Sequence, residues 1–231
     1  MKLLLIASDR MEFQGLLRRC EQARRAALSV DWSRLARLGA HDVLLAANGV
    51  GARRAGAAVD AALAIFSADS VVSLGFCGAL APELAVADIV VATGIAAADG
   101  RFAAQPPAAA PAHRAGTVCS LDHVARTAEE KRGLRATGSI AVEMEAAGVA
   151  ARAATLGRPF YCIKAVTDLA GESMANDFNS TLRPDGHFDT MEILRSSLRH
   201  PWVRLPELFR LRKRCLRASK VLGDFVADCR F

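Results

Sequence analysis

Two carboxylates stand two positions apart in a segment that is otherwise apolar or small. The decapeptide Ala141–Ala150 reads AVEMEAAGVA, and Glu143 and Glu145 are its only charged residues. A buried carboxylate is costly unless it is hydrogen-bonded, ion-paired or protonated, so such residues generally have a partner or a task. In a strand the two side chains share a face, whereas in a helix they diverge. Structurally, Glu145 could simply begin a helix over residues 146–156, where the helix dipole favours an anion.

Two further acidic residues follow apolar segments. Asp168 comes directly after Phe160–Val166 and Thr167, and Glu12 follows the apolar segment Lys2–Ala7. In α/β proteins, ligands gather at the carboxyl ends of the strands. Asp168 is therefore either a turn or cap former, or a carboxylic acid delivered to a pocket. The residues alone leave both interpretations open.

Two glycine-containing segments are predicted to turn at strand ends and to direct backbone N–H groups at a ligand. The first, ANGVGARRAG at residues 47–56, lacks the third glycine and the downstream acidic residue of a dinucleotide fingerprint. The second is Gly75–Gly78, which contains Cys77. A nucleophilic role for Cys77 is not favoured, because no histidine stands in a suggestive position and buried thiols are commonly inert.

Apolar strands that alternate with helices are expected to position these residues. The predicted strands cover residues 2–7, 43–47, 70–74, 89–95, 117–119 and 160–166. The predicted helices cover residues 12–27, 52–66, 124–134, 146–156 and 189–198. This order predicts a single-domain α/β fold with a central mixed sheet flanked by helices.

Three segments are predicted to lie at the surface. The Ala- and Pro-rich segment Ala96–Ala115 has no periodicity and is expected to be a loop. Residues 171–186 are more polar and are expected to form a loop or lid. The helix over residues 124–134 is expected to expose a charged cluster that consists of Glu129, Glu130, Lys131 and Arg132.

The C-terminal segment holds the excess of positive charge. Residues 195–231 contain ten Lys and Arg against three Asp and Glu, so the rest of the chain is nearly neutral, given a total charge of +6. From Arg204 onward, apolar residues recur at three- and four-residue steps, which predicts a basic amphipathic helix. This helix either packs on the domain with a solvated basic face or docks on an acidic membrane surface. Nucleic acid is not expected as a partner, because no recognised motif accompanies the basic residues and aromatics are few.

Length and composition favour one domain of a cytoplasmic protein. The chain has 231 residues without a dividing linker, and its apolar runs fall short of the roughly 18 residues of a spanning helix. Leu3–Ala7 is too short for a signal-peptide core. Six cysteines without a CxxC pair predict reduced thiols, with neither a disulfide frame nor a metal site. We expect a domain at residues 1–203 and a helical appendage at residues 204–231.

Taken in order, these motifs resemble the purine nucleoside phosphorylase and nucleosidase superfamily, and most closely its 5′-methylthioadenosine/S-adenosylhomocysteine nucleosidases. AVEMEAAG resembles the family's V-E-M-E-A motif, and KAVTDLA at residues 164–170 resembles R-A-I-S-D-x-A. GFCGALAPELAVADIVV at residues 75–91 is similar to a glycine-rich family segment, and ANGVG is similar to S-G-I-G. The resemblance extends from Met1 to about Ser180.

The resemblance implies an N-glycosidase that cleaves the purine–ribose bond of a 5′-substituted adenosine, without a metal or other cofactor. Such a reaction passes through an oxocarbenium-like ribosyl cation while the purine leaves. By resemblance, Asp168 protonates the purine, Glu12 deprotonates the attacking water, and Glu145 accepts hydrogen bonds from the ribose hydroxyls. The other residues implied to bind substrate are Met144 against the ribose, Cys77 and Gly78 along the base, His123 stacked on the purine, and Lys164.

Several residues depart from the family pattern. Lys164 replaces an arginine, which turns a bidentate contact into a point charge. Phe76 stands where phosphorolytic relatives tend to carry a small hydroxyl side chain, and no arginine pair for phosphate is recognisable. Water is therefore favoured as the nucleophile, although Arg10, Arg53 or Arg54 could supply an anion site. The basic C-terminal helix is similar to the hopanoid-associated branch, in which the adenosyl group sits on a lipid.

Several functional hypotheses follow from the sequence. The first is a nucleosidase acting on a small-molecule purine nucleoside as a homo-oligomer. The alternatives within the superfamily are a phosphate-dependent phosphorylase and an enzyme that releases adenine from an adenosylated lipid. Outside enzyme catalysis, the chain could bind nucleosides without turnover, or act at a membrane surface through its C-terminal helix.

Overall fold

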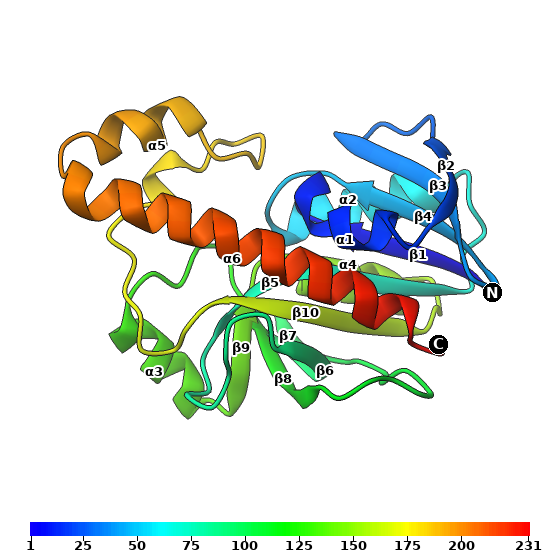
Figure 1. The fold of residues 1–231 in the computed structure, drawn as a ribbon. Coiled ribbons are helices and arrows are strands. Elements are labelled where there is room, and N and C mark those ends of the chain that lie inside the picture. Colours follow the sequence, from blue (N-terminus) through cyan, green and yellow to red (C-terminus); the bar gives the residue numbers. More distant parts are fainter.

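Ten strands form one sheet in the computed structural model, which describes residues 1–231 (Figure 1). β1, β4, β5 and β10 run parallel to one another, so their carboxyl ends meet at the same edge. The other pairings are of both kinds, which makes the sheet mixed, as predicted. The strands are β1 (Lys2–Ala7), β2 (Glu21–Arg25), β3 (Trp32–Leu38), β4 (His41–Ala47), β5 (Ser70–Ala79), β6 (Ile89–Ala97), β7 (Gly100–Ala103), β8 (Arg114–Ser120), β9 (Ser139–Glu143) and β10 (Phe160–Asp168).

β5 is the strand that joins the two parts of the sheet. It pairs with β1 on one side, and with both β9 and β10 through different parts of its length. Because β10, β6, β8 and β9 pair in that order, the double pairing of β5 closes these five strands into a ring. The remaining strands β1, β4, β3 and β2 extend from β5 as an open sheet.

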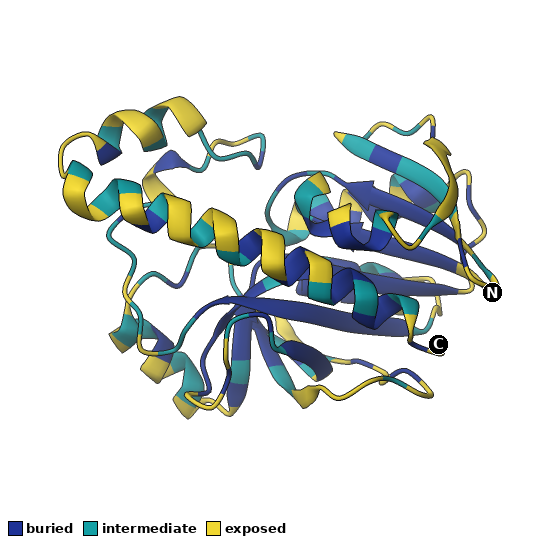
Figure 2. Ribbon diagram, viewed as in Figure 1, coloured by how far each residue is buried: buried dark blue, intermediate teal, exposed yellow.

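Helices cover both faces of the sheet. α2 and α4 pack on each other over one face, whereas α1 and α6 pack on each other over the opposite face (Figure 1). A separate apolar core lies under each pair, and the strands between them are largely buried (Figure 2). The helices are η1 (Arg10–Phe13), α1 (Gln14–Leu17), α2 (Ala52–Leu63), α3 (Ala128–Ala136), α4 (Ala146–Thr155), η2 (Asn179–Thr181), α5 (Thr190–Ser197) and α6 (Pro201–Ala227).

α6 is the long amphipathic helix predicted from the C-terminal sequence, and it begins at Pro201. Its inner face buries Cys215, Ala218, Leu222 and Phe225 against the sheet and α1. No helix in the structure is both long enough and apolar enough to cross a membrane. The division of the chain into a domain and an appendage at residue 203 stays a prediction.

The predicted helix over residues 12–27 is wrong. The helical segment ends at Leu17, and residues 21–25 form β2, an exposed edge strand paired with β3. The sequence pattern failed because β3 was not recognised. The free edge of β3 offers backbone hydrogen bonds to the preceding segment, residues 21–25, which becomes β2. Gln22, at a φ of 53°, departs from helical geometry within this segment.

Three other expectations need correction. Gly75–Gly78 is not a turn, because β5 continues through it to Ala79. The expected loop Ala96–Ala115 contains β7, and β8 begins within it at Arg114. Lys131 was expected to be exposed, but its side chain is fully buried.

Candidate active site

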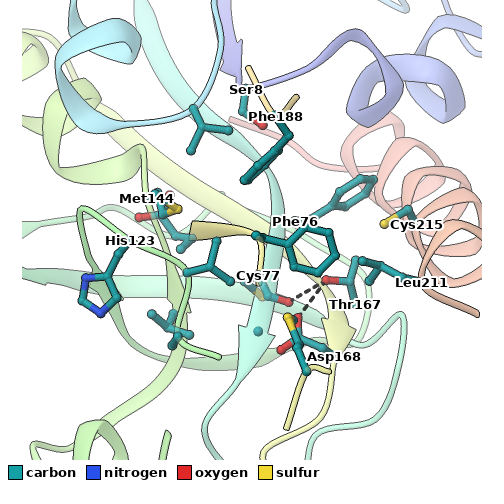
Figure 3. A pocket seen from close by; sticks show the side chains of 18 of the residues that line it. Ser8, Phe76, Cys77, His123, Met144, Thr167, Asp168, Phe188, Leu211 and Cys215 are labelled. Atoms are coloured by element: carbon teal, nitrogen blue, oxygen red, sulfur yellow. Dashed lines mark hydrogen bonds between the residues drawn. The ribbon is translucent and has the colours of Figure 1, made fainter. Parts of the chain in front are cut away.

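A cavity of about 290 Å³ lies where the carboxyl ends of β1, β5, β9 and β10 converge (Figure 3). Four carboxylates from three distant segments line it, namely Glu12, Glu143, Glu145 and Asp168. Seven of the eight predicted site residues line this cavity, while Lys164 lies behind it. Those seven are Glu12, Cys77, Gly78, His123, Met144, Glu145 and Asp168.

Glu12 is held by the turn that follows β1. Its Oε2 accepts hydrogen bonds from Ser8 N at 2.8 Å, Ser8 Oγ at 2.9 Å and Asp9 N at 3.0 Å. Its Oε1 accepts one bond, from Phe76 N at 2.7 Å, so this oxygen keeps accepting capacity for a water or hydroxyl. Burial raises the pKa of Glu12, although Lys164 and these donors act in the opposite direction. A buried carboxylate of this kind is suited to accept a proton.

Gly75 makes room for the Glu12 carboxylate. Its φ of 145° is rarely adopted by residues with a side chain, and a Cβ there would lie 2.4 Å from Glu12 Oε1. The close approach allows the N–H of Phe76, the next residue in β5, to reach the carboxylate. The glycine therefore serves the placement of the acid rather than a turn.

Glu143 and Glu145 have different surroundings, because the chain changes from β9 to α4 between them. Glu143 accepts hydrogen bonds from the N–H groups of Glu145 and Ala146, at 3.0 and 2.8 Å, and so caps the start of α4. Glu145 does not cap the helix, and its side chain enters the cavity, where Oε1 accepts a bond from Gly51 N at 3.2 Å. Burial, with the nearby Glu143 carboxylate, raises the pKa of Glu145 to about 8.

Lys164 supplies the positive charge behind these glutamates. Its Nζ lies 2.8 Å from Glu143 Oε2 and 3.9 Å from Glu145 Oε2, and the side chain is buried. Burial alone would lower the pKa of Lys164, but the surrounding carboxylates raise it, so the amine stays protonated. In this structure Lys164 contacts the acids and does not line the cavity.

Asp168 is placed at the end of β10 with two donors. Thr167 Oγ1 donates to Oδ1 at 3.1 Å and also lies 3.3 Å from the Cys77 carbonyl oxygen (Figure 3). On the other side, Lys131 Nζ of α3 lies 2.5 Å from Oδ2. Burial raises the pKa of Asp168, and Lys131 opposes this shift. Gly78 permits the close packing, since a Cβ there would lie 2.8 Å from Oδ2.

Lys131 is the main functional candidate that sequence reasoning missed. In addition to Asp168, its ammonium donates to the carbonyl oxygens of Leu169 at 2.9 Å and Glu172 at 3.4 Å. A fully buried lysine requires such partners. The charged sequence around it (EEKR) gave no signal of burial, because its Asp168 partner is 37 positions away.

The remaining predicted residues lie at the wall and rim of the cavity. Met144 and Cys77 are nearly buried wall residues, and burial raises the pKa of the Cys77 thiol well above its usual range. His123 is at the rim, where Asp122 and Glu130 each lie 2.7 Å from one of its ring nitrogens. These carboxylates raise the pKa of His123. Figure 3 shows its ring on the opposite side of the cavity from Leu211 and Cys215.

An apolar wall from the C-terminal part of the chain closes another side of the cavity. It was not predicted from the sequence, and it consists of Met174, Phe178, Phe188, Ile193, Leu211 and Cys215. No Arg or Lys lines the cavity. Arg53 and Arg54, considered above as an anion site, line a neighbouring hollow, and Arg10 is exposed. The cavity thus presents acids to one part of a ligand and apolar groups to another.

Comparison with protein families identifies one match. The model of the Phosphorylase superfamily matches residues 34–112 and 102–186, which together are more than half of the chain. Among characterised relatives, the 5′-methylthioadenosine/S-adenosylhomocysteine nucleosidase of Marinomonas sp. (strain MWYL1) is 28% identical over 173 residues, covering 62% of this chain and 74% of the relative. The nucleosidase of the same name from Tolumonas auensis is 27% identical over 175 residues, covering 63% and 76%.

Solved structures show the same fold. A 5′-methylthioadenosine/S-adenosylhomocysteine nucleosidase from Neisseria meningitidis, in complex with methylthio-immucillin-A, aligns with a TM-score of 0.75 and 21% identity over 98% of this chain and 96% of that chain. Futalosine hydrolase of Helicobacter pylori aligns with a TM-score of 0.73 and 14% identity over 98% and 95%. Enzymes with different named substrates thus share this fold.

Proposed function

The chain belongs to the phosphorylase superfamily, and on this premise we propose that it is a nucleosidase that cleaves the purine–ribose bond of a 5′-substituted adenosine. The observation that carries the proposal is the convergence of Glu12, Glu145 and Asp168, from three distant segments, on one cavity. The curated relatives are named as 5′-methylthioadenosine/S-adenosylhomocysteine nucleosidases, which supports this substrate class.

Asp168, Glu145 and Glu12 have different roles in the reaction. Asp168, in protonated form, gives its proton to the imidazole-side nitrogen of the purine, so that the base leaves as a neutral molecule. Burial favours that protonated form by raising the pKa of Asp168. Proton transfer from a positioned acid typically contributes about 10² to 10⁴ in rate. Lys131 then stabilises the carboxylate that remains.

Glu145 and Glu12 act on the sugar side. Glu145 accepts hydrogen bonds from the ribose hydroxyls, and its negative charge, once ionised, stabilises the ribosyl cation. Glu12 takes a proton from the attacking water through Oε1, the oxygen with remaining accepting capacity. Met144 and Cys77 pack against the ribose and base, and His123 stacks on the purine at the rim. Lys164 holds Glu143 in place by an ion pair and partly opposes the rise in the pKa of Glu145.

Water is the nucleophile that the cavity favours over phosphate. A dianionic phosphate bound beside these carboxylates needs positive charge, and neither Arg nor Lys lines the cavity. Phe76 adds an apolar side chain at the wall. We therefore place the phosphate-dependent phosphorylase second.

The test is adenine release from methylthioadenosine and S-adenosylhomocysteine in phosphate-free buffer. Wild-type protein is expected to release adenine without phosphate, and Asp168→Asn is expected to lower kcat by about 10² to 10⁴ while still binding nucleoside. Asp42→Asn, an exposed aspartate of β4, is the matched control and should leave kcat unchanged.

Two results would overturn the proposal. Strict dependence on phosphate would make the protein a phosphorylase. Nucleoside binding without release of base, equally tight in wild type and in Asp168→Asn, would make it a binding protein.

The proposal extends to assembly and location. We infer that the enzyme works in the cytoplasm as a homo-oligomer and contacts a membrane surface through α6. A large hollow next to the cavity, lined by α2 and α4, shares Val50 and Met144 with it and offers a place for a second copy. Sedimentation analysis of the full chain measures the oligomeric state directly.

A further inference from the structure

The outer face of α6 carries a row of exposed apolar side chains. Trp202 is 91% exposed, Phe209 is 71% exposed and Leu216 is 45% exposed. They recur every seven residues, which is close to two helical turns, so they lie along one line of the helix. The opposite face buries Cys215, Ala218 and Leu222. The row therefore lies on the solvent side of α6, whose ribbon alternates between exposed and buried residues in Figure 2.

Basic residues flank this row. Arg210, Arg212, Lys213, Arg217 and Lys220 are all exposed, and none has a carboxylate within 4.0 Å. The acidic residues of α6 do not balance them. Glu207 is buried against Asn176, and Asp224 pairs with Arg19. The outer face of α6 thus combines exposed apolar side chains with unpaired positive charges.

The exposed apolar surface continues onto α5, which lies beside the first part of α6 (Figure 1). Met191 is 75% exposed, Leu194 is 47% exposed and Leu198 is 62% exposed. Val203, at the start of α6, is 61% exposed. These residues belong to one end of the molecule, where most exposed large apolar side chains of the chain are found. A patch of this kind normally marks an interaction surface.

The charge of the patch selects its partner. In a two-fold contact between copies of the chain, the same surface faces itself, so Lys213, Arg217 and Lys220 would meet like charges. An anionic bilayer complements both features, because its headgroups attract the basic residues and its interfacial layer accepts Trp, Phe and Leu side chains. The charges also exclude insertion across the bilayer.

We propose that the outer face of α6, together with α5, docks in the plane of a membrane surface that contains anionic lipid. Docking extends the proposed function to a partner. It rests on that function only in its link to the cavity, which we propose is the nucleosidase site. Ile193 of α5 and Leu211 and Cys215 of α6 line the cavity with their inner faces. The docked elements therefore contribute part of the apolar cavity wall, so docking places this wall next to the bilayer.

Vesicle sedimentation of the full chain tests the docking itself, independently of catalysis. The probes are vesicles of phosphatidylcholine alone and of phosphatidylcholine mixed with phosphatidylglycerol. Wild type is expected to bind the mixed vesicles and to release from them at high salt. The double variants Trp202→Ser/Phe209→Ser and Lys213→Glu/Arg217→Glu are each expected to bind at least about tenfold more weakly.

Two control variants separate this face from general surface properties. Ile65→Ser removes an apolar side chain that is 55% exposed just after α2, and Arg24→Glu/Arg25→Glu reverses two exposed charges on β2. Both should bind mixed vesicles as wild type does. All variants should keep the wild-type melting temperature and the wild-type rate of adenine release in the absence of vesicles, because none touches the cavity.

Three results would overturn the proposal. The first is equal binding of wild type and the α6 variants to mixed vesicles. The second is wild-type binding to neutral vesicles that is as strong as binding to mixed ones. The third is absence of vesicle binding combined with self-association that Trp202→Ser/Phe209→Ser abolishes, which would assign the face to a second copy. Loss of nucleosidase activity with retained vesicle binding would contradict the proposed function alone.

Discussion

Two features of its surroundings shift the pKa of Asp168 in opposite directions. Burial favours the neutral acid, whereas Lys131 favours the carboxylate. Other charged groups nearby are Glu172 and its partner Arg214 of α6. A general acid must hold a proton before the transition state and lose it during the reaction. In the proposed mechanism, the Lys131–Asp168 pair therefore sets the pH range over which Asp168 can act as the general acid.

Replacing Lys131 with Met tests this assignment through the pH profile. The ammonium lowers the pKa of Asp168, so its removal is expected to raise that pKa further. Asp168 then stays protonated to higher pH, and the alkaline limb of kcat/KM is expected to move to higher pH. Lys131→Arg keeps the positive charge and should leave the limb near its wild-type position. Coincident profiles for the Met variant and wild type would show that Lys131 has only a structural role.

Gly75 offers a second test at the level of single residues. In Gly75→Ala the new Cβ meets the Glu12 carboxylate, and the φ of 145° is unfavourable for alanine. We expect kcat to fall by about tenfold or more and the free energy of unfolding to fall by roughly 1–3 kcal/mol. Gly133→Ala, in α3, has open space around the new Cβ and is the control. A Gly75→Ala enzyme with normal kcat would contradict the role of Glu12.

α6 contributes to the site although its residues are far from Glu12 in sequence. Ser219 Oγ of α6 donates to Met11 O at 2.7 Å and accepts from Gly15 N at 3.1 Å. These bonds join α6 to the turn that holds Glu12 on both sides of that residue. The helix therefore supports the candidate general base in addition to covering the sheet.

Ser219→Ala tests this support. The substitution leaves the buried Gly15 N–H without its side-chain acceptor and removes one of the two donors to Met11 O, which typically costs about 1–3 kcal/mol. We expect a lower melting temperature together with a lower kcat, because the Glu12 turn loses its anchor. Ser180→Ala, at an exposed serine of η2, is the control for loss of a hydroxyl. Full activity in Ser219→Ala at a reduced melting temperature would limit the role of α6 to stability.

The elements also show what the sequence could and could not predict. Strands β1, β4 and β10 were predicted because each is an apolar run that is buried on both faces. In contrast, the strand that ends at Glu143 was not predicted, so the sequence left open which of Glu143 and Glu145 faces the cavity. β5 runs through two glycines that normally end a strand, because close contacts with Glu12 and Asp168 require them. Contacts between residues that are far apart in the chain leave no pattern in the local sequence. The burial of Lys131 could not be predicted for the same reason, because its partner is Asp168.

At the scale of the whole molecule, the buried acids, with Lys131 and Lys164 beside them, lie apart from the excess of basic residues. The acids Glu12, Glu143, Glu145 and Asp168 are buried around the cavity, whereas the basic excess lies on the outer face of α6. Buried acids destabilise the folded state in proportion to the shift of their pKa values. The protein therefore loses stability at the same groups that its proposed chemistry requires, as is common in active sites.

Glu145 allows this cost to be measured. Its pKa rises from an ordinary value of 4.5 to about 8 on folding, so between these pH values the folded state holds a proton that the unfolded state releases. The contribution of Glu145 to the free energy of unfolding therefore decreases as the pH rises through this window. Glu145→Gln cannot ionise and is expected to gain stability relative to wild type between about pH 5 and about pH 8.5, by up to a few kcal/mol, while losing activity.

Urea unfolding of both proteins across this pH range measures the difference, with Glu83→Gln at an exposed position as the control. The difference between Glu145→Gln and wild type should be small at the acidic end, grow through neutral pH and level off above the folded pKa. Parallel stability curves would mean that Glu145 is ionised throughout, held by Lys164 at 3.9 Å. In that case the negative charge proposed to stabilise the ribosyl cation is present before substrate binds. A growing difference means instead that the nucleoside meets a neutral Glu145 at neutral pH, and that stabilisation of the ribosyl cation by Glu145 should increase as this carboxyl ionises.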